Sequence, residues 1–463
     1  MGANVKSGRD QFRSRLRYMI EDLKNDILNG TYKPNDFLPS ESDLVQRYGL
    51  SNKSVRKGLD ELVADGWIVK INRVGSKVTE KGQESNVITL GISSSIEQDI
   101  VLSKLLGDFN VLYPHLQVKT LTITNTNYIS QIKNYLEHGL VDIFTLNSLH
   151  FQELEENGGI SLLEPLESDQ EAYPFLNKVF QHQSNQYANP IVFSPIVLVY
   201  NRAHFAEENV PEPDGSWTWE DTLKYSEILS RVNGRLGIYF IMVSSLRWPV
   251  FLFQSGEEFK LDENGQYDIT DSQLLESIKL CKRIIKKQSN YLGFLVENNM
   301  DVMDLFRQGK VSMMMASYMA LNELKDTDLD FDVSPTPFIH TPSTMLHTIG
   351  VSLRKLDHDN KAARLLVDYL KSARANNIIH KWSNSIPAIR FLGETHTEEP
   401  NLINRPFRYH LYREIITTYQ SNSRLNLSAQ NFEKLGRLLK KYWSDLISED
   451  ELCQMVKEGL YER

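Results

Sequence analysis

A short polar stretch near the N-terminus has the side chains needed to contact a nucleic acid. Arginine and lysine neutralise phosphates, serine and threonine hydroxyls anchor the backbone, and Asn52 can pair with an adenine edge through two hydrogen bonds. Arg56 is the strongest single candidate for a DNA contact. The basic candidates are Lys53, Arg56, Lys57, Arg73 and Lys77. An ordinary solvated basic surface is the alternative interpretation of the same residues.

The charge of the chain is unevenly divided. Residues 1–81 contain 15 Lys and Arg against 11 Asp and Glu, a net charge of +4, whereas the rest of the chain has a net charge of −13. A polyanion would be attracted to the basic N-terminal part. We therefore expect the N-terminal part, and not the acidic remainder, to bind double-stranded DNA.

The elements that position these residues can be read from the hydrophobic periodicity of residues 10–80. An amphipathic helix runs up to Gly30, and a second helix, with Ser40 as its N-cap, stops before Gly49. Ser51 is the predicted N-cap of a third helix, and the stretch WIVKINRVGSKVTE predicts a β-hairpin. The third helix is expected to direct Lys53, Ser54, Arg56 and Lys57 outward. Together these elements predict a helix-turn-helix with a hairpin wing.

The pattern YxxPxDxLPSExxLxxxxGLSxxSVRxGLxxLxxDGWI…VGSKV resembles the winged helix of the GntR family of transcription regulators. The resemblance implies a dimeric regulator whose third helix and wing contact an operator through Ser51, Asn52, Lys53, Ser54, Arg56, Gly75, Ser76 and Lys77. At Ser42, also a predicted contact, and at Asn52 the family commonly has arginine. These two departures leave the operator sequence open.

From Asn86 onward strands and helices alternate. VITLGISS, QVKTLTI and VDIFTLN are expected strands of a parallel sheet, with helices between them. Ser94 and Asn147 follow two of these strands, where open α/β sheets bind their ligands. The run YANPIVFSPIVLVYN predicts a crossing between two lobes, so the remainder of the chain is expected to be a two-lobed ligand-binding domain.

The order of several motifs resembles the extracellular solute-binding proteins of ABC transporters, especially the type that binds oligosaccharides. The motifs are VDIFTLN, PIVLVYNRAHF, WTWEDTLKYSEIL, WPVFLFQSGEEF, FRQGKVSMMMASYMA, HTIGVSL and SNSIPAIR. The resemblance implies stacking of a sugar on Trp248, Tyr318 and Trp382, and polar contacts from Ser94, Asn147, His347 and Arg390. Packing in the core is the alternative role for each of these aromatic residues.

Several classes of protein are not expected. No apolar run approaches the roughly 20 residues of a membrane span, and no secretory signal is recognisable, so we expect a cytoplasmic protein. Cys281 and Cys453 are expected to be reduced thiols, without a metal or redox role. No phosphate loop, HExxH, GxSxG or pyridoxal phosphate lysine context is present, and we expect neither enzymatic activity nor a cofactor or metal.

The predicted fold is multidomain. It comprises an α+β winged helix-turn-helix at residues 1–82, a linker at 83–87 and a two-lobed α/β effector domain at 88–463, with the lobe crossing near 190–200. The predicted function is a dimeric repressor of a palindromic operator, controlled by a sugar or oligosaccharide that closes the two lobes. The alternatives are a regulator that senses an amino acid, a peptide or another solute, and a cytosolic binding protein whose N-terminal part is an interaction module.

Overall fold

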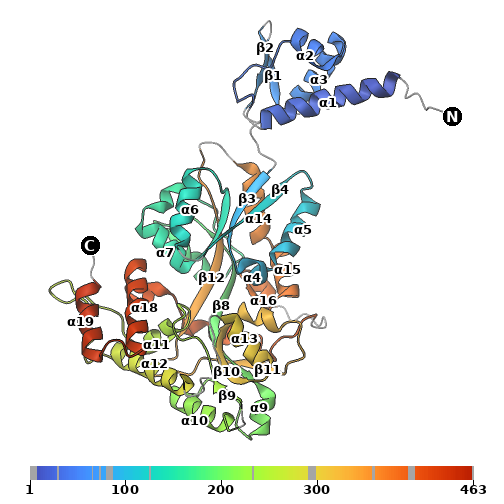
Figure 1. Cartoon of the computed structure of the whole chain (residues 1–463). Coiled ribbons are helices and arrows are strands. Elements are labelled where there is room, and N and C mark those ends of the chain that lie inside the picture. Colours follow the sequence, from blue (N-terminus) through green and yellow to red (C-terminus); the bar gives the residue numbers. More distant parts are fainter. Residues whose placement is uncertain are drawn as a thin grey trace. The chain divides into compact units, whose positions relative to one another are not determined.

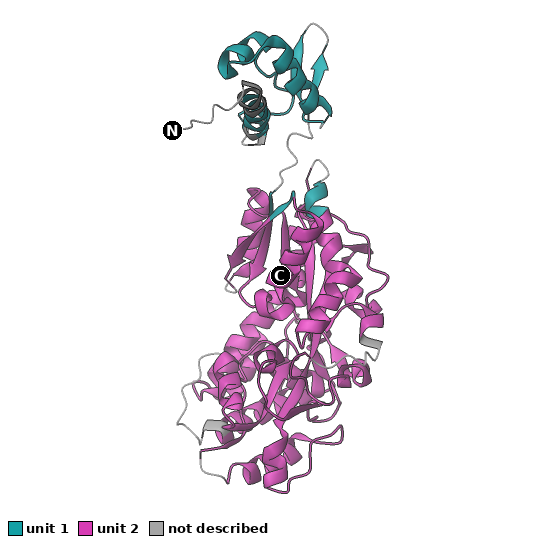
Figure 2. Ribbon diagram, turned by 90° about the vertical axis from the view of Figure 1, so that its right-hand side faces the viewer, with its two compact units in different colours: residues 1–88, 115–117, 358–364 teal, residues 89–114, 118–357, 365–463 magenta. Residues whose placement is uncertain are grey.

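The computed structural model describes residues 8–28, 31–64, 66–71, 74–79, 87–124, 127–231, 234–289, 299–356, 360–394 and 402–460. Figure 2 shows two compact units: residues 1–88 with 115–117 and 358–364 form one, and the remainder forms the other. We call residues 8–79 the head and residues 87–460 the body, and describe each by itself.

The head has the predicted helix-turn-helix and wing. Ser40 and Asp43 form a capping box at the start of the second helix, and Gly49 ends this helix with a φ of 61°. Leucine, isoleucine and valine side chains from all three helices and both strands form one small core. The elements are α1 (Gly8–Leu28), α2 (Glu41–Tyr48), α3 (Asn52–Ala64), β1 (Ile68–Ile71) and β2 (Gly75–Val78) (Figure 1).

The first lobe of the body begins with the predicted alternation of strands and helices. β3 and β5 are parallel, as expected, with Leu90 opposite Ile143. Figure 1 shows α6 and α7 on one side of these strands and α5 on the other. The elements are β3 (Val87–Ser93), α4 (Ile96–Ile100), α5 (Leu102–Leu112), β4 (Gln117–Ile123), α6 (Tyr128–Glu137), β5 (Ile143–Asn147) and α7 (Ser148–Glu156).

A long strand, β8 (Asn189–Asn201), is shared by both lobes. Its first half pairs with β12 (Thr344–Leu353), which continues the sheet of the first lobe through β5. Its second half pairs with β10 (Val311–Ser317) and β11 (Phe331–Ser334) in the second lobe. The strand order β4-β3-β5-β12-β8-β10-β9 therefore runs through both lobes and ends at β9 (Leu236–Ile238). The sheet is mixed, because β12 and β8 are antiparallel to their neighbours.

All thirteen residues of β8 are buried. Its second half is covered on both faces, so it has no polar side. Ile196 and Leu198 enter one apolar cluster, whereas Val197 and Val199 enter another. This alternation follows from the two-residue period of a strand. The methionine run of β10 divides in the same way, with Met314 in the second cluster.

The remaining elements cover the second lobe and complete the first. None of the helices in the described part of the chain has the length and apolarity that a bilayer crossing requires. The helices are α8 (Pro174–Val179), α9 (Arg202–Glu207), α10 (Trp219–Leu229), α11 (Trp248–Gln254), α12 (Gln273–Ser289), α13 (Asn299–Arg307), α14 (Lys361–Lys371), α15 (Ala373–Trp382), α16 (Arg390–Glu394), α17 (Leu411–Glu414), α18 (Ala429–Trp443) and α19 (Glu449–Gly459). The short strands are β6 (Gln181–His182), β7 (Asn185–Gln186), β9 (Leu236–Ile238), β13 (Ile386–Pro387) and β14 (Tyr419–Gln420).

Candidate functional site

The start of α3 presents a polar surface to solvent. Ser51 caps the helix, as predicted, because its Oγ accepts the backbone N–H of Ser54 at 3.3 Å. Asn52, Lys53 and Arg56 follow on the exposed side of the first turns. Side chains at the start of a recognition helix are the ones that reach base edges in a major groove. Their contact with DNA stays a prediction.

Arg56 is paired with a carboxylate from the preceding helix. Its Nε donates to Oε2 of Glu41 at 2.7 Å, and the side chain of Arg56 is 65 % exposed. The hydrogen bond to Glu41 raises the pKa of Arg56, so the guanidinium is cationic throughout the physiological range. An exposed ion pair of this kind is weak, and a phosphate can replace the carboxylate.

Two predicted DNA contacts are corrected by the structure. Ser54 is only 5 % exposed, because it lies one helical turn before Gly58 and two before Leu62, which face the core. Its Oγ hydrogen-bonds to Oγ of Ser51 at 2.7 Å. Ser76 is 9 % exposed, because the alternation of β2 turns it inward. Neither hydroxyl is presented to a groove.

The wing keeps its other predicted contacts at the surface. Gly75 has a φ of 144°, which a residue with a side chain rarely adopts, and a Cβ there would lie 3.4 Å from the ring of Phe37. Lys77 is partly exposed on β2, and Ser42 is exposed on α2. Arg73 lies outside the described residues.

In the body, the carboxyl ends of strands from both lobes converge on the middle of β8. Asn147, the last residue of β5, lies opposite Ile349 of β12, and the same strand places His347 opposite Ser194. Ser317, the last residue of β10, lies opposite Ile196. We call Ser194, Ser317, His347 and Asn147 the strand crossing. It corresponds to the position where open α/β sheets bind ligands.

Two neutral imidazoles lie at the strand crossing. His150 stacks on Tyr128 with ring centroids 4.4 Å apart, and burial together with the neighbouring His347 lowers the pKa of His150 to about 3. Burial lowers the pKa of His347 to about 4. Asn147 caps α7, since its Oδ1 accepts the N–H of His150 at 2.9 Å. A neutral imidazole offers one donor and one acceptor, which suits an uncharged hydroxyl.

Two of the three predicted stacking residues belong to the core. Tyr318 is fully buried and meets Tyr409 edge to face at 5.6 Å. Trp248 is 3 % exposed and stacks on Phe432 at 4.6 Å. Tyr318 follows a strongly apolar run, and Trp248 precedes one. Because such runs pack in the core, they predict the role of these two rings better than the family resemblance does. Neither ring is open to a sugar.

The other predicted ligand residues are dispersed. Ser94 is exposed in the turn after β3. Trp382, at the end of α15, is 36 % exposed, but its ring is covered by Nζ of Lys104 at 4.2 Å from the centroid. Arg390 is exposed at the start of α16, three residues after β13. Of the seven predicted ligand residues, only Asn147 and His347 are brought together at the strand crossing.

Sequence reasoning missed Ser194, His150 and Arg247. Ser194 is fully buried, and its Oγ accepts the N–H of Tyr318 at 2.7 Å, which joins the end of β10 to β8. Arg247 is a buried cation next to the end of β10. The sequence contains a signal for Arg247, because this residue directly precedes the apolar run WPVFLF. A charged side chain beside a buried segment must be stabilised by a specific contact.

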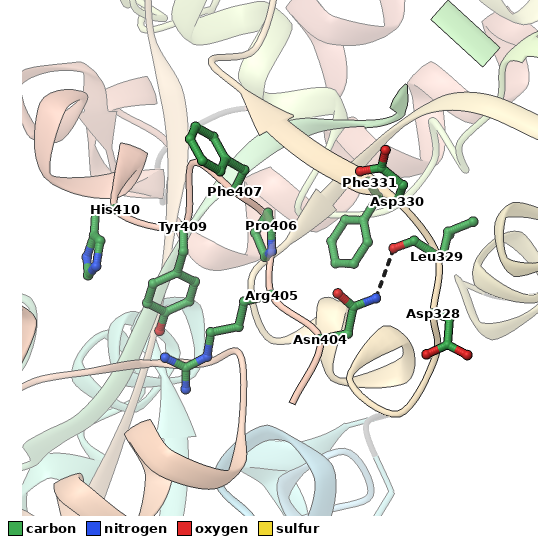
Figure 3. A pocket seen from close by; sticks show the side chains of 10 residues that line it. All are labelled: Asp328, Leu329, Asp330, Phe331, Asn404, Arg405, Pro406, Phe407, Tyr409 and His410. Carbon is green, nitrogen blue, oxygen red and sulfur yellow. Dashed lines mark hydrogen bonds between the residues drawn. The ribbon is translucent and has the colours of Figure 1, made fainter. Parts of the chain in front are cut away.

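A pocket of about 470 Å³ is lined by none of the residues of the strand crossing (Figure 3). Figure 3 shows the carboxylates of Asp328 and Asp330 on one side and Arg405 on the other, with the amide of Asn404 bonded to the carbonyl of Leu329 at 2.9 Å. None of the predicted ligand residues lines this pocket. Among the described residues there is no group of three His, Cys, Asp or Glu side chains placed to hold a metal ion.

The body matches a family of known proteins. Residues 93–377, more than half of the chain, match the family described as bacterial extracellular solute-binding protein. The chain belongs to this family. Residues 18–78 match the gntR family of bacterial regulatory proteins, so the solute-binding domain is preceded by a GntR-type winged helix.

Solved structures confirm the two-lobed fold of the solute-binding domain. The substrate-binding protein Lmo0181 from Listeria monocytogenes, in complex with cycloalternan, has a TM-score of 0.67 and 17 % identity, over 81 % of this chain and 97 % of that one. Maltose-bound T. maritima MalE3 has a TM-score of 0.68 and 15 % identity, over 80 % and 98 %. At these identities the similarity concerns the fold alone.

Curated relatives match a limited part of the chain. The arabinose metabolism transcriptional repressor of Halalkalibacterium halodurans is 28 % identical over 131 residues, 27 % of this chain and 35 % of the relative. The histidine utilization repressor of Pseudomonas putida is 36 % identical over 84 residues, 18 % of this chain and 33 % of the relative. The chain thus spans about a third of the length of these relatives.

Proposed function

We propose that the chain is a cytoplasmic, dimeric transcriptional repressor that binds a palindromic operator through its head and responds to a small solute through its body. The observation that carries this proposal is the presence of a GntR-type winged helix and a solute-binding domain in one chain. A solute-binding domain fused to a DNA-binding head can use ligand binding to change DNA affinity.

The effector is a sugar or oligosaccharide in this proposal. Support comes from neighbours of the same fold that bind cycloalternan and maltose, and from the neutral imidazoles of His150 and His347, which suit hydroxyl groups. An amino acid or peptide effector is the second candidate, because the histidine utilization repressor shows that related heads serve regulators named for other nutrients.

The coupling mechanism follows from the shared strand. Lobe closure about β8 would rearrange the body, and a dimer requires a set separation of its two α3 helices to reach half-sites about one DNA turn apart. We expect the effector to change operator affinity by about 1–3 kcal/mol, with the same effect of operator on effector affinity. The sign is to be measured, and release of the repressor by its inducer is the expected outcome.

Operator binding by the full chain is the first test. We would select binding sites from a random DNA pool and measure affinity against salt, expecting a linear loss with log salt concentration. Arg56→Ala should weaken binding by about tenfold. Arg437→Ala is a matched control, because Arg437 is also 65 % exposed and paired with a glutamate, but on α18 of the body. Failure to select any sequence, or equal affinity of the two variants, would contradict the proposal.

The effector is tested by thermal unfolding of the full chain with mono- and oligosaccharides, amino acids and short peptides. A ligand at a hundredfold excess over its Kd stabilises the folded state by about 2.7 kcal/mol. Stabilisation by one class of saccharide, followed by a change in operator affinity, is the expected result. Stabilisation by amino acids or peptides alone would overturn the sugar assignment.

A further inference from the structure

Arg247 is a buried cation that forms no ion pair with any residue the structure describes. The residue is 5 % exposed and precedes α11. Its Nε donates to the carbonyl of Met315 at 3.1 Å, and Nη1 donates to Oγ of Ser244 at 3.0 Å. A guanidinium has five N–H donors. Nη2 makes no hydrogen bond within the described part of the chain.

Two other charged residues of the described part, Arg235 and Asp332, are comparably buried, and both are paired with an opposite charge. Arg235 is also 5 % exposed, but it donates to the carboxylates of Glu207 at 2.6 Å and Glu208 at 2.9 Å. Asp332, which is 2 % exposed, is paired with Arg408 at 3.2 Å. Arg247 and Arg235 lie in the same lobe and are equally buried. They differ because carboxylates pair with Arg235, whereas no described carboxylate pairs with Arg247.

An uncompensated buried charge is unfavourable, because the low-dielectric interior replaces the water that would stabilise it. Burial lowers the pKa of Arg247 to about 10, which leaves the side chain cationic at neutral pH. A core that only had to fill this volume would use an apolar residue. The free donors of Arg247 thus have the arrangement that a planar anion such as a carboxylate or phosphate accepts in two hydrogen bonds.

The position of Arg247 links it to the strand crossing. Met315, its carbonyl partner, lies two residues before Ser317 on β10. Ser244, its hydroxyl partner, lies in the connection between β9 and α11. β9 and β10 are parallel, so their carboxyl ends lie on the same edge of the second lobe. Arg247 is consequently held at the edge where the ligand of a solute-binding domain is expected.

We propose that Arg247 binds the negatively charged group of the effector, and that the effector is a small solute with a carboxylate or phosphate, such as an acidic or phosphorylated sugar. The inference rests on the proposed sensing role of the body and narrows its ligand class. Ser244 positions the guanidinium through Nη1, while Nη2 and the remaining N–H of Nη1 meet the anion.

The stability of two matched variants of the full chain tests whether Arg247 is structural or ligand-binding. Arg235→Met removes a compensated cation, and we expect a lower Tm for the body, by about 2 °C or more. Arg247→Met removes an uncompensated cation at equal burial, and we expect a Tm equal to or above that of the wild type. A fall in Tm as large as that of Arg235→Met would overturn the proposal. Arg247→Gln is the second variant, in case methionine does not pack.

Anion binding is tested by titrating the full chain with inorganic phosphate, acetate, D-glucuronate, D-glucose 6-phosphate and D-glucose at constant ionic strength. We expect an anion to raise Tm in the wild type, with an apparent affinity about tenfold or more weaker in Arg247→Gln. Phosphate and acetate arms separate the two kinds of anion. Equal responses of wild type and Arg247→Gln to every probe, or a response to D-glucose alone, would overturn the proposal.

Operator binding separates this inference from the proposed function. An anion that stabilises the body through Arg247 but leaves operator affinity unchanged would refute the regulatory coupling and leave the anion site standing. Operator binding that responds to a neutral sugar in both wild type and Arg247→Gln would refute the anion site and leave the regulatory coupling standing.

Discussion

Arg56 and Glu41 form an ion pair that a DNA phosphate must replace. Glu41→Gln should strengthen operator binding at low salt by up to about fivefold, because an exposed ion pair stabilises the free protein by roughly 0.2–1 kcal/mol. Fluorescence anisotropy with the selected operator measures the change.

The control for this prediction is Glu41→Gln in a chain that lacks the Arg56 side chain. In an Arg56→Ala background, Glu41→Gln should no longer strengthen binding beyond the small gain from removing one negative charge. An equal gain in both backgrounds would show that Glu41 acts by general repulsion of DNA and not by holding Arg56.

His347 should make the body sensitive to acid. Its pKa of about 4 in the folded state is below the roughly 6.5 of an unfolded histidine. Between these values the unfolded state binds a proton that the folded state does not, so stability falls as pH falls, by up to about 1.4 kcal/mol per pH unit. Urea unfolding of His347→Gln at pH 7 and pH 5 should show a smaller loss than the wild type.

The wild type, unfolded at the same two pH values, is the comparison for this prediction. If His347→Gln and the wild type lost stability in parallel between pH 7 and pH 5, the burial of His347 would not be the cause of acid sensitivity.

Residue-level predictions from the sequence succeeded where local spacing decides the outcome. The caps at Ser40 and Ser51 were predicted, because a cap depends only on the next three residues. Trp248 and Tyr318 were misassigned as ligand platforms, because their partners Phe432 and Tyr409 lie far along the chain. Side chains that meet over such separations leave no local pattern.

At the scale of elements, α7 of the first lobe supports the start of α18. Both carboxylate oxygens of Glu156 accept the N–H of Ala429, at 2.9 and 3.0 Å, and Gln152 donates to the carbonyl of Leu427 at 2.8 Å. A carboxylate at a helix N-terminus satisfies a free N–H and complements the helix dipole. This contact joins an apolar cluster of each lobe, since Phe151 and Phe432 belong to different clusters.

Glu156→Ala should therefore lower the free energy of unfolding of the body by about 0.5–2 kcal/mol. Urea unfolding followed by circular dichroism provides the measurement. Glu137→Ala is the matched control, because Glu137 is exposed at the end of α6. A loss no larger than that of Glu137→Ala would mean that water replaces the carboxylate at the start of α18 without cost.

The order of the strands was only partly predictable. β3, β4 and β5 follow one another with helices between them, and the sequence predicted that arrangement. β12 lies between β5 and β8 in the sheet although some 200 residues separate it from β5. Its apolar sequence is compatible with many neighbours, so only the folded chain decides where it inserts.

For the whole molecule, we expect two thermal transitions. The apolar cluster of the head contains only residues from α1 to β2, and the clusters of the body contain none of these. Units with separate cores need not unfold together. Calorimetry of the full chain should show a smaller transition for the head and a larger one for the body.

Ligands identify the two transitions. Operator DNA should raise the smaller transition and the effector the larger one, each by mass action. A single transition that both ligands raise equally would show that head and body unfold as one cooperative unit, and would contradict the assignment of independent cores.

β8 has a consequence for how such a chain can arise. Because this one strand supplies a central position to the sheets of both lobes, deleting either lobe removes a buried partner from the other. The body can thus be inherited, duplicated or exchanged only as a whole. The head shares no strand with the described sheet of the body. Recombination can therefore replace the head and connect the same sensor domain to a different operator sequence.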